Sequence, residues 1–422
     1  MPTRTPRTVP RPPLTYQEAL DFLFPRTTTI KFGLETTRAL LDALGDPHLV
    51  YPTVHVAGTN GKGSVCTLVA EALREAGWNV GLYTSPHLVS FRERIRVDGV
   101  PISEDAVAMW TSRLAPLIRR RKATFFEATT VMALADFAAR GAEIAVVEVG
   151  LGGRLDSTNV LQPLVSAVTK IDRDHQKYLG DTLEAIAREK AWIAKPETPF
   201  VVGERNPGLI DVLRREAAAA VRALGGSRTD FRVLPPAYEW PGPLRLAGKH
   251  QRRNAGLAHG VLMALPAPYR PTPSQVAAGF ARAAVPGRFD RRGRWLFDVA
   301  HNPDGIGALV EALADEAVPR PIHALVSILG DKPWAEMLVQ LDTAIERGVL
   351  TMAPTAASRG WQAHWLEEWL HQPDRPPAQA SRSLVPDFRR ALTEVQEGAG
   401  TVLVAGSFHT VGDVMQALGL DP

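Results

Sequence analysis

The sequence predicts an α/β protein in which a larger domain with a mostly parallel sheet is followed by a smaller α/β domain. Short apolar runs alternate with helical stretches from end to end, which is typical of parallel sheets. The length of 422 residues suits two domains, at roughly 100–200 residues each. A short segment, Ala284-Val285-Pro286-Gly287, separates two series of strands and is expected to be a linker. We therefore expect a disordered basic tail over 1–13, a first domain over 14–284 and a second over 285–422.

The first series begins with a strand at 53–57, a glycine-rich turn and a helix. In that helix Val65, Leu68 and Val69 recur at helical spacing, and Gly77 is expected to end it. Further strands are predicted at 79–83, 145–149, 165–169 and 200–202, with helices around 125–140 and 182–194. The stretch 225–250 contains several prolines and is predicted to be mostly loop.

The second series follows the linker. Strands are predicted at 294–299, 322–329, 349–352 and 401–405, with a helix over 305–313 and further helices between the others. Each domain is long enough to bury a core of its own.

Composition excludes several classes of protein. Lys and Arg total 48 against 45 for Asp and Glu, and the net charge of +3 is too small to indicate nucleic-acid binding. A single cysteine, Cys66, excludes a disulfide framework and is expected to be a small core residue. No apolar run approaches the roughly 18–20 residues of a membrane span, and the basic start has no apolar core like that of a secretory signal. We expect a cytoplasmic protein.

The strongest motif lies between the first strand and its helix. It reads Gly58-Thr59-Asn60-Gly61-Lys62-Gly63-Ser64. Glycines allow successive backbone N–H groups to face one anion, and the helix N-terminus adds positive potential there. Lys62 is placed to reach outer phosphates and Ser64 to ligate Mg²⁺. The spacing differs from the usual phosphate loop, and a plain glycine turn is the alternative, but the coincidence of strand, loop, lysine and hydroxyl favours nucleotide binding.

This loop resembles the ATP loop of the Mur ligase superfamily, and especially that of the folylpolyglutamate synthase/dihydrofolate synthase family. Further blocks follow in the order found in that family, and together they cover nearly the whole chain. They are residues 84–88, 93–95, 124–129, 148–159, 174–175, 189–191, 250–254, 286–288 and 298–302. Each block alone is weak, but the ordered set is specific.

The resemblance implies a phosphate-loop domain followed by a Rossmann-like C-terminal domain that ligates glutamate. It implies an ATP- and Mg²⁺-dependent amide ligase, active as a monomer, that adds L-glutamate to dihydropteroate or to the glutamate tail of reduced folates. A substrate carboxylate would attack the γ-phosphate to give an acyl phosphate, which the amine of glutamate would then displace. Two Mg²⁺ ions and a carbamylated Lys190 are implied as well.

The resemblance also assigns residues to roles. The ATP-binding set is Gly58, Thr59, Asn60, Gly61, Lys62, Gly63, Ser64, Asn254, Arg288 and Asp298. The catalytic set is Lys62, Glu148, His175, Lys190 and His301, and the metal ligands are Ser64, Ser85, Glu148 and His175. The folate-binding set is Thr28, Thr29, Ile30, Lys31, Thr124, Phe125, Phe126, Glu127, Leu155, Asp156 and Ser157. Asp331-Lys332 resembles a further block on the substrate side.

Each residue also has a plain structural alternative: a turn for Ser85, core packing for Phe125 and Phe126, and an exposed helix face for Lys190. Among whole functions, the rivals are a phosphate-loop kinase or NTPase acting on another small molecule, and a cell-wall amino-acid ligase. A kinase would not need the blocks around Lys190 and His301. The cell-wall ligases carry a domain ahead of the loop, for which the 57 residues before Gly58 are too few.

Overall fold

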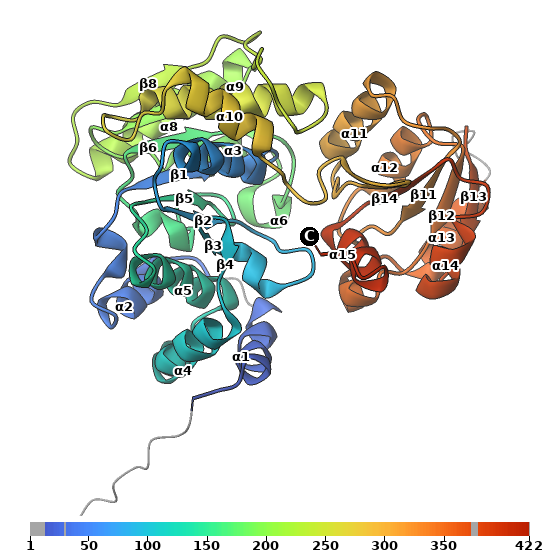
Figure 1. Cartoon of the computed structure of the whole chain (residues 1–422), viewed down its shortest axis with the longest axis horizontal. Helices are drawn as coiled ribbons and strands as arrows, with labels where there is room; N and C mark the ends of the chain where they lie inside the picture. Colours follow the sequence, from blue (N-terminus) through green and yellow to red (C-terminus); the bar gives the residue numbers. More distant parts are fainter. Residues whose placement is uncertain (1–12, 29–30, 373–378, 422) are drawn as a thin grey trace, which may run out of the picture.

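A computed structural model describes residues 13–28, 31–372 and 379–421 of the chain (Figure 1). Almost all of the tail expected over 1–13, and the folate-side residues Thr29 and Ile30, lie outside the described residues. The described chain forms two β-sheets, each covered by helices, and the predicted α/β class is confirmed. No helix of the described chain is long and apolar enough to cross a membrane.

The first sheet has eight strands in the order β4-β3-β2-β5-β1-β6-β7-β8. From β2 to β8 neighbouring strands run parallel, whereas β3 and β4 form an antiparallel edge. The strands are β1 (Thr53–Ala57), β2 (Val80–Tyr83), β3 (Ile95–Val97), β4 (Val100–Pro101), β5 (Ile144–Glu148), β6 (Val165–Val168), β7 (Pro199–Val202) and β8 (Asp230–Val233).

Ten helices of the described chain accompany this sheet. They are α1 (Tyr16–Leu23), α2 (Glu35–Asp42), α3 (Lys62–Glu75), α4 (Glu104–Arg121), α5 (Phe125–Ala139), α6 (Gln176–Leu179), α7 (Leu183–Ala191), α8 (Pro207–Ala223), α9 (Lys249–Ala264) and α10 (Pro273–Arg282). Helices α3, α9 and α10 pack on one face, while α1, α2, α4 and α5 pack on the other (Figure 1). In β5, Val146 faces the first group and Val147 the second, which explains why the central strands are apolar throughout.

The second sheet has six strands in the order β13-β12-β11-β14-β10-β9, parallel except for β9. The strands are β9 (Asp290–Arg292), β10 (Trp295–Phe297), β11 (Ile322–Val326), β12 (Arg347–Leu350), β13 (Ser381–Leu384) and β14 (Thr401–Ala405). The helices are α11 (Pro303–Asp315), α12 (Trp334–Leu341), α13 (Ala363–Leu370), α14 (Phe388–Glu394) and α15 (Phe408–Ala417).

The strands predicted at 53–57 and 401–405 have the expected bounds. The stretch 225–250 is mostly loop, as expected, but it also contains the short strand β8, which was not predicted. This strand pairs only with β7 at the sheet edge and is half-buried, so it carries no apolar run that would mark it. The strand expected at 322–329 ends at Val326, and Glu148 is the last residue of β5.

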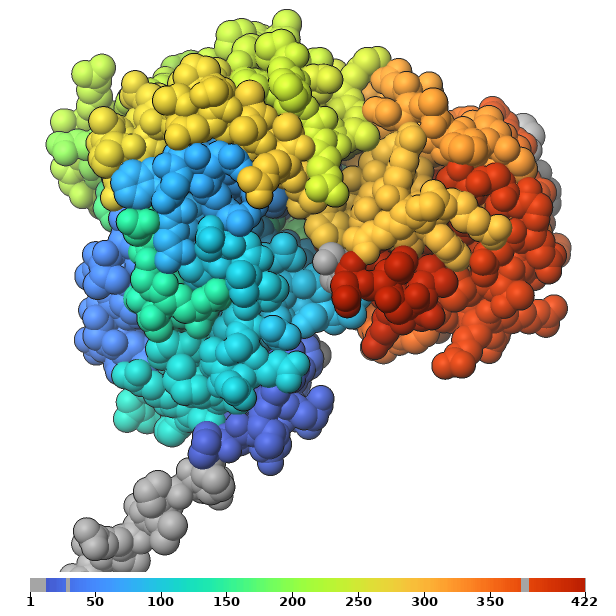
Figure 2. Space-filling view, viewed as in Figure 1, coloured from blue at the N-terminus to red at the C-terminus, as the bar shows by residue number. Residues whose placement is uncertain are grey.

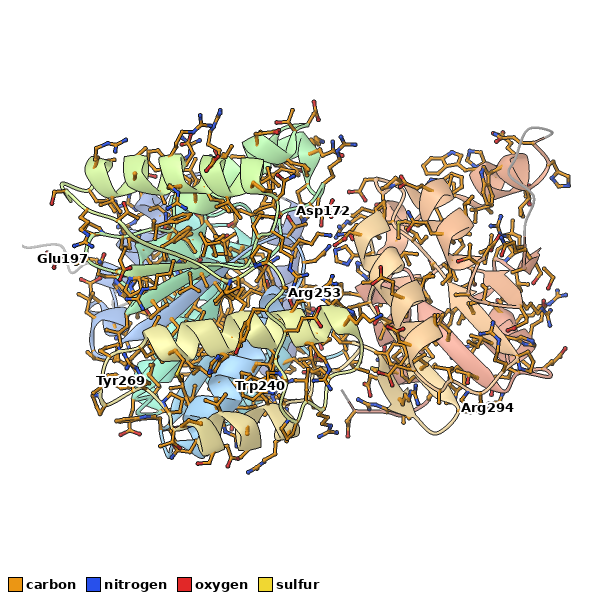
Figure 3. All side chains as sticks on the ribbon, turned by 90° about the horizontal axis from the view of Figure 1, so that it is seen from above. Asp172, Glu197, Trp240, Arg253, Tyr269 and Arg294 are labelled. Carbon is orange, nitrogen blue, oxygen red and sulfur yellow. The ribbon has the colours of Figure 1, made fainter. Side chains whose placement is uncertain are left out.

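The two sheets lie in separate lobes, side by side, and the linker from the end of α10 to β9 joins them (Figure 1). In the space-filling view the two lobes meet over a limited area, with a notch below the contact (Figure 2). Seen from above, Asp172 and Arg253 lie on the side of the first lobe that faces the second (Figure 3). Asp172 follows β6, so carboxyl ends of parallel strands, where ligands of α/β proteins bind, lie at this boundary.

Candidate active site

The phosphate loop joins β1 to α3 and is held tightly by its neighbours. A Cβ at Gly58 would stand 1.7 Å from Thr169 Oγ1, and one at Gly61 would stand 2.4 Å from Asn254 Oδ1. Both residues also have positive φ, +146° and +89°. These two positions therefore require glycine on steric and conformational grounds. Lys62 Nζ donates to the carbonyl oxygens of Gly58 and Thr59, at 3.1 and 3.0 Å, so its amine lies over the loop.

A cavity of about 660 Å³ at the domain boundary is lined by both domains, and it is the larger of two adjoining cavities. Of the predicted ATP-binding residues, it contacts Asn60, Gly61, Ser64, Asn254, Arg288 and Asp298. Arg288 is buried, which lowers the pKa of its guanidinium, and Asp298 lies near enough to oppose that shift. The Asp298 carboxylate accepts backbone N–H bonds from Phe289 and Ala300, both at 2.9 Å. Asp298 thus ties the linker to the end of β10.

A smaller cavity of about 110 Å³ adjoins the first. All five predicted catalytic residues line it: Lys62, Glu148, His175, Lys190 and His301. Gly58, Thr59, Gly63 and the predicted metal ligand Ser85 line it too, whereas Ser64 faces the larger cavity. Asn60, Gly61, Arg288 and His301 are common to both cavities. The structure therefore brings together residues that are far apart in the sequence and come from both domains.

Glu148 offers a buried carboxylate at the end of β5. It is 4% exposed, and its Oε2 accepts the backbone N–H of Ser85 at 3.0 Å. Burial raises its pKa, and the nearby charges of Lys62, Arg288 and Arg94 act in the opposite direction. A buried carboxylate calls for a compensating cation. With serine hydroxyls nearby, the donor set is one of hard oxygens, which suits Mg²⁺.

His175 follows β6 and lines the same cavity. Desolvation lowers its pKa, Asp174 raises it and Lys332 lowers it further, with a net decrease. Its imidazole is therefore neutral near pH 7 and has a nitrogen free to ligate a metal. No cluster of three or more His, Cys, Asp or Glu side chains suited to a metal occurs among the residues the structure covers. A divalent ion here would depend on hydroxyls, water and phosphate oxygens as well.

Lys190 lies in the last turn of α7 and is 4% exposed. Burial lowers its pKa to about 7, and the charge of Lys62 adds to the decrease. Within the described chain no acceptor lies within hydrogen-bond distance of its amine. This is unusual for a buried lysine, since a buried charge is normally paired. The expectation of an exposed helix face does not hold for Lys190.

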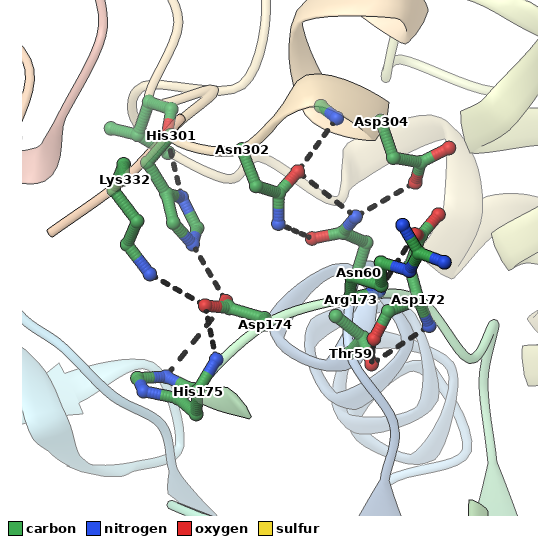
Figure 4. Close-up of polar contacts among 12 residues, drawn as sticks. Thr59, Asn60, Asp172, Arg173, Asp174, His175, His301, Asn302, Asp304 and Lys332 are labelled. Atoms are coloured by element: carbon green, nitrogen blue, oxygen red, sulfur yellow. Dashed lines mark hydrogen bonds and ion pairs between the residues drawn. The ribbon is translucent and has the colours of Figure 1, made fainter. Parts of the chain in front are cut away.

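The segment after β6 meets the second domain through Asp174 (Figure 4). Lys332 Nζ lies 2.5 Å from Asp174 Oδ1, and His301 Nε2 lies 3.5 Å from Oδ2. The backbone N–H of His175 donates to Oδ1 at 2.8 Å. Although burial alone would raise the pKa of Asp174, the hydrogen bond from His301 and the charges of His175 and Lys332 lower it strongly. Asp174 is thus a carboxylate at any ordinary pH.

A second set of contacts joins the phosphate loop itself to the second domain. Asn60 and Asn302 exchange side-chain hydrogen bonds of 3.3 and 3.1 Å, and Asn60 Nδ2 donates to Asp304 Oδ2 at 2.7 Å (Figure 4). Asp304 also pairs with Lys170. Asn302 caps α11, because its Oδ1 accepts the backbone N–H of Gly305 at 2.8 Å.

The predicted folate-binding residues that the structure describes line neither of the two cavities. Thr124 and Glu127 bind each other as the capping box of α5, and Phe125 is buried in the core. Phe126 packs against Gly150, where a Cβ would stand 2.2 Å from the ring. The remaining described members come from the other two segments, 28–31 and 155–157. Thr28 is in a 3₁₀ turn, Lys31 donates to Thr36 Oγ1 at 2.6 Å, Asp156 and Ser157 are buried, and Leu155 is half-buried.

Sequence reasoning did not assign roles to Asp174, Asn302 or Asp304, and it placed Lys332 only in a substrate-side block. Each of these residues acts through a contact across the domain boundary. The local signal for Asn302 was present, since Asn-Pro-x-Gly is a helix-capping pattern. No local pattern indicates that its amide also reaches Asn60.

Comparisons with known proteins agree on one group. The Mur ligase middle domain matches residues 56–262, and the Mur ligase glutamate ligase domain matches residues 287–408. The dihydrofolate synthase/folylpolyglutamate synthase of Bacillus subtilis is 32% identical, over 96% of this chain and 99% of that protein. The "probable bifunctional folylpolyglutamate synthase/dihydropteroate synthase" of Haloferax volcanii is 35% identical over 94% of this chain, which spans about half the length of that relative.

Solved structures are similar over nearly the whole chain. E. coli FolC in complex with DHPP and ADP superposes with a TM-score of 0.81 at 30% identity, covering 96% of this chain and 98% of that one. A bifunctional folylpolyglutamate synthase/dihydrofolate synthase with Mn, AMPPNP and L-glutamate bound gives a TM-score of 0.79 at 30% identity, with coverage of 96% and 98%.

Proposed function

The chain belongs to the dihydrofolate synthase/folylpolyglutamate synthase family of Mur ligases, and from this premise we propose how its residues carry out the reaction. The chain is an ATP-dependent ligase that adds L-glutamate to dihydropteroate, to the glutamate tail of reduced folates, or to both. The observation that carries the assignment of roles is the pair of adjoining cavities. The larger one is lined by the phosphate loop and the linker, and the smaller one collects Lys62, Glu148, His175, Lys190 and His301.

The larger cavity holds ATP, with its phosphates at the loop. A carboxylate oxygen of the acceptor attacks the γ-phosphorus, the bond to ADP breaks, and an acyl phosphate forms. The amine of glutamate then attacks the acyl carbon, phosphate leaves, and a proton is lost from the nitrogen. Both steps bring anions together, so fixed cations and positioning supply the catalysis. Lys62 lines the smaller cavity, and Arg288 lines both cavities, as does His301 of the second domain.

A divalent ion belongs to this site, and we assign two Mg²⁺ ions to it. Ser64 and Ser85 would ligate the ion on the ATP phosphates, while Glu148 and His175 would ligate the ion near the acyl phosphate. Bound there, the ions would neutralise charge on phosphate oxygens. The buried Glu148 carboxylate and the neutral imidazole of His175 support this assignment, because a carboxylate oxygen and an unprotonated imidazole nitrogen are both able to ligate a divalent ion.

We also propose that Lys190 is carbamylated. Its amine has a pKa of about 7 and therefore has a large neutral fraction at physiological pH. A neutral amine adds to CO₂ to give a carbamate and a proton, and the product is an anion. The carbamate would replace a buried cation next to Lys62 with an anion, and it would add a negative group to those of Glu148 and Asp174 in the smaller cavity.

Three further points belong to the same proposal. Residues 14–284 and 285–422 act as two domains with ATP between them, as the shared lining of the larger cavity supports. The folate body binds along 28–31, 124–127 and 155–157, outside the two cavities. The protein acts as a cytoplasmic monomer.

Product analysis tests the function directly. The full chain is incubated with ATP, Mg²⁺ and L-glutamate, once with dihydropteroate and once with tetrahydrofolate as acceptor, and the products are identified by mass spectrometry. We expect one ADP, one phosphate and one new amide per turnover, dependent on glutamate. ATP turnover without an amide product in either arm would instead indicate an NTPase.

A further inference from the structure

Lys332 stands in the second domain, yet its side chain ends next to the first. It lies in the turn between β11 and α12, where its backbone N–H donates to Leu329 O at 3.1 Å. Its amine lies 2.5 Å from Asp174 Oδ1, and the two side chains are only 10% and 8% exposed. The pair is therefore a buried ion pair that crosses the domain boundary (Figure 4).

The position of this pair matters because Asp174 immediately precedes His175. The carboxylate that Lys332 contacts also accepts the backbone N–H of His175, and its second oxygen lies 3.8 Å from His175 Nε2. His175 has φ +52° and ψ +33°, a left-handed conformation that costs free energy for a residue with a Cβ. The Asp174 carboxylate thus helps to hold His175 in this backbone conformation, together with the N–H groups of Tyr178 and Leu179, which donate to His175 O, and it also borders the imidazole.

Lys332 does not line either cavity, whereas Asp174, His175 and His301 all line the smaller one. The amine therefore lies behind Asp174 as seen from the cavity. A lysine that bound a substrate carboxylate would have to face the cavity instead. Lys332 is therefore placed to support Asp174 and not to contact a substrate in the cavity.

We propose that Lys332 is a positioning residue for the metal side of the site. From the second domain it fixes the Asp174 carboxylate, and through Asp174 it orients His175. The metal-binding side chain is therefore set correctly only when the two domains are in contact. Groups that orient a metal ligand tune metal affinity about as strongly as some ligands do. The inference rests on the proposed function, because it takes His175 as a ligand of the divalent ion.

Direct metal binding provides the first test. Mn²⁺ is titrated into the full chain with AMPPNP present and followed by electron paramagnetic resonance. We expect Lys332→Met to weaken Mn²⁺ binding by about tenfold, and Asp174→Asn to weaken it by a similar factor. Lys332→Arg should restore most of the affinity, since it keeps the charge. The double variant should be no worse than the weaker-binding single variant, because the two residues act in one chain of contacts.

Lys249→Met is the matched control. Lys249 of α9 and Asp315 of α11 also form a Lys–Asp pair across the boundary, at 3.0 Å, but their side chains are 59% and 39% exposed and line neither cavity. This variant should bind Mn²⁺ within about twofold of wild type, as expected for an exposed pair.

Steady-state kinetics provide the second test. In Lys332→Met the Mg²⁺ concentration for half-maximal rate should rise about tenfold, while KM for glutamate stays within about twofold. A folded Lys332→Met protein with wild-type Mn²⁺ affinity would overturn the proposal. So would a raised KM for glutamate with unchanged Mn²⁺ binding, since that result would make Lys332 a substrate contact. If Lys332→Met does not fold, Asp174→Asn carries the same comparison, and normal Mn²⁺ binding by that variant would be equally decisive.

These readouts stand apart from the proposed function. A wild-type protein that binds Mn²⁺ with AMPPNP but forms no glutamate amide would refute the function, and the Mn²⁺ series would still decide the role of Lys332. A loss of Mn²⁺ affinity confined to the Lys332 and Asp174 variants would support the positioning role in either case.

Discussion

The two domains supply the same cavities in different ways. The first domain contributes a continuous motif, in which residues 58–64 follow a strand and begin a helix, so the phosphate site is built mainly from neighbours in sequence. The second domain lines the cavities mainly with residues between Asp298 and Gly305, after β10, while Lys332 after β11 contacts Asp174 without lining either cavity. These meet the first domain only through tertiary contacts. The local half of the site is thus specified by strand, loop and helix, and the other half by how the domains meet.

The difference has an energetic side. The loop is stabilised by its own backbone and by contacts of Thr59 with Lys170 O and Asp172 O, at 2.9 and 3.0 Å, within one domain. The contacts between the domains are partly polar, with an ion pair at Asp174 and an amide pair at Asn60, and partly apolar, because Leu88 and Val89 pack against the core of the second domain. The second half of the site therefore depends on both kinds of contact between the domains.

The largest loss of activity is expected from a substitution in the phosphate loop. Lys62→Ala should lower kcat by at least about a hundredfold, because it removes the cation closest to the phosphates while leaving the β1–α3 packing intact. The check is the rate of ADP release at saturating ATP, with a thermal unfolding curve to show that the fold persists. Near-normal turnover would refute the role of the loop as the phosphate site.

Substitutions of Lys190 should cause the next largest loss of activity. Lys190→Ala should be nearly inactive, and acetate should restore part of the rate by supplying a carboxylate in the vacated space. Lys190→Arg should remain inactive, since arginine keeps its charge and does not form the carbamate. A fully active Lys190→Arg variant would rule the carbamate out.

Lys190 also predicts a pH dependence. Its pKa is lowered to about 7, so the neutral amine that reacts with CO₂ predominates above pH 7 and is lost below it. In buffer with limiting bicarbonate, activity should therefore fall more steeply between pH 7 and pH 6 than in buffer with excess bicarbonate. Equal profiles in the two buffers would contradict this reading.

Glu148 should give an intermediate effect. Glu148→Ala removes a buried oxygen ligand, so the Mg²⁺ concentration for half-maximal rate should rise about tenfold or more. Because Glu148 also accepts the Ser85 N–H, Glu148→Gln is the companion variant that keeps an acceptor there without the charge. An unchanged Mg²⁺ titration in both variants would leave Glu148 with a structural role only.

Much of the fold and part of the candidate site could be predicted from the sequence. Strand β1, the glycine loop and α3 form a pattern in which periodicity, glycine positions and lysine all agree. Strand β8 escaped prediction because an edge strand that is half-buried has no continuous apolar run. Asp174 and Lys332 escaped it for another reason. A carboxylate and an amine 158 positions apart carry no sign in the sequence that they will pair.

Asn302 has both a local role within the second domain and a contact with the first domain. Its Oδ1 caps α11 through Gly305, a local role, and its Nδ2 donates to Asn60 Oδ1 at 3.1 Å, a contact between the domains. Asn302→Ala removes both, so it should lower the free energy of unfolding by about 1–2 kcal/mol and also weaken ATP binding. Asn302→Asp keeps the oxygen that caps the helix, loses the donor to the phosphate loop and adds a negative charge near Asp304.

The two variants should therefore separate the two roles. Asn302→Asp should unfold in urea at nearly the wild-type midpoint, since aspartate is as good a cap as asparagine and its charge suits a helix N-terminus. Both variants should raise KM for ATP by only about threefold to tenfold, the value of one or two hydrogen bonds at the loop. Wild-type KM in Asn302→Asp would show that the contact with Asn60 does not shape the ATP site. Equal loss of stability in both variants would show instead that the contact between the domains, rather than the cap, is what Asn302 contributes to the fold.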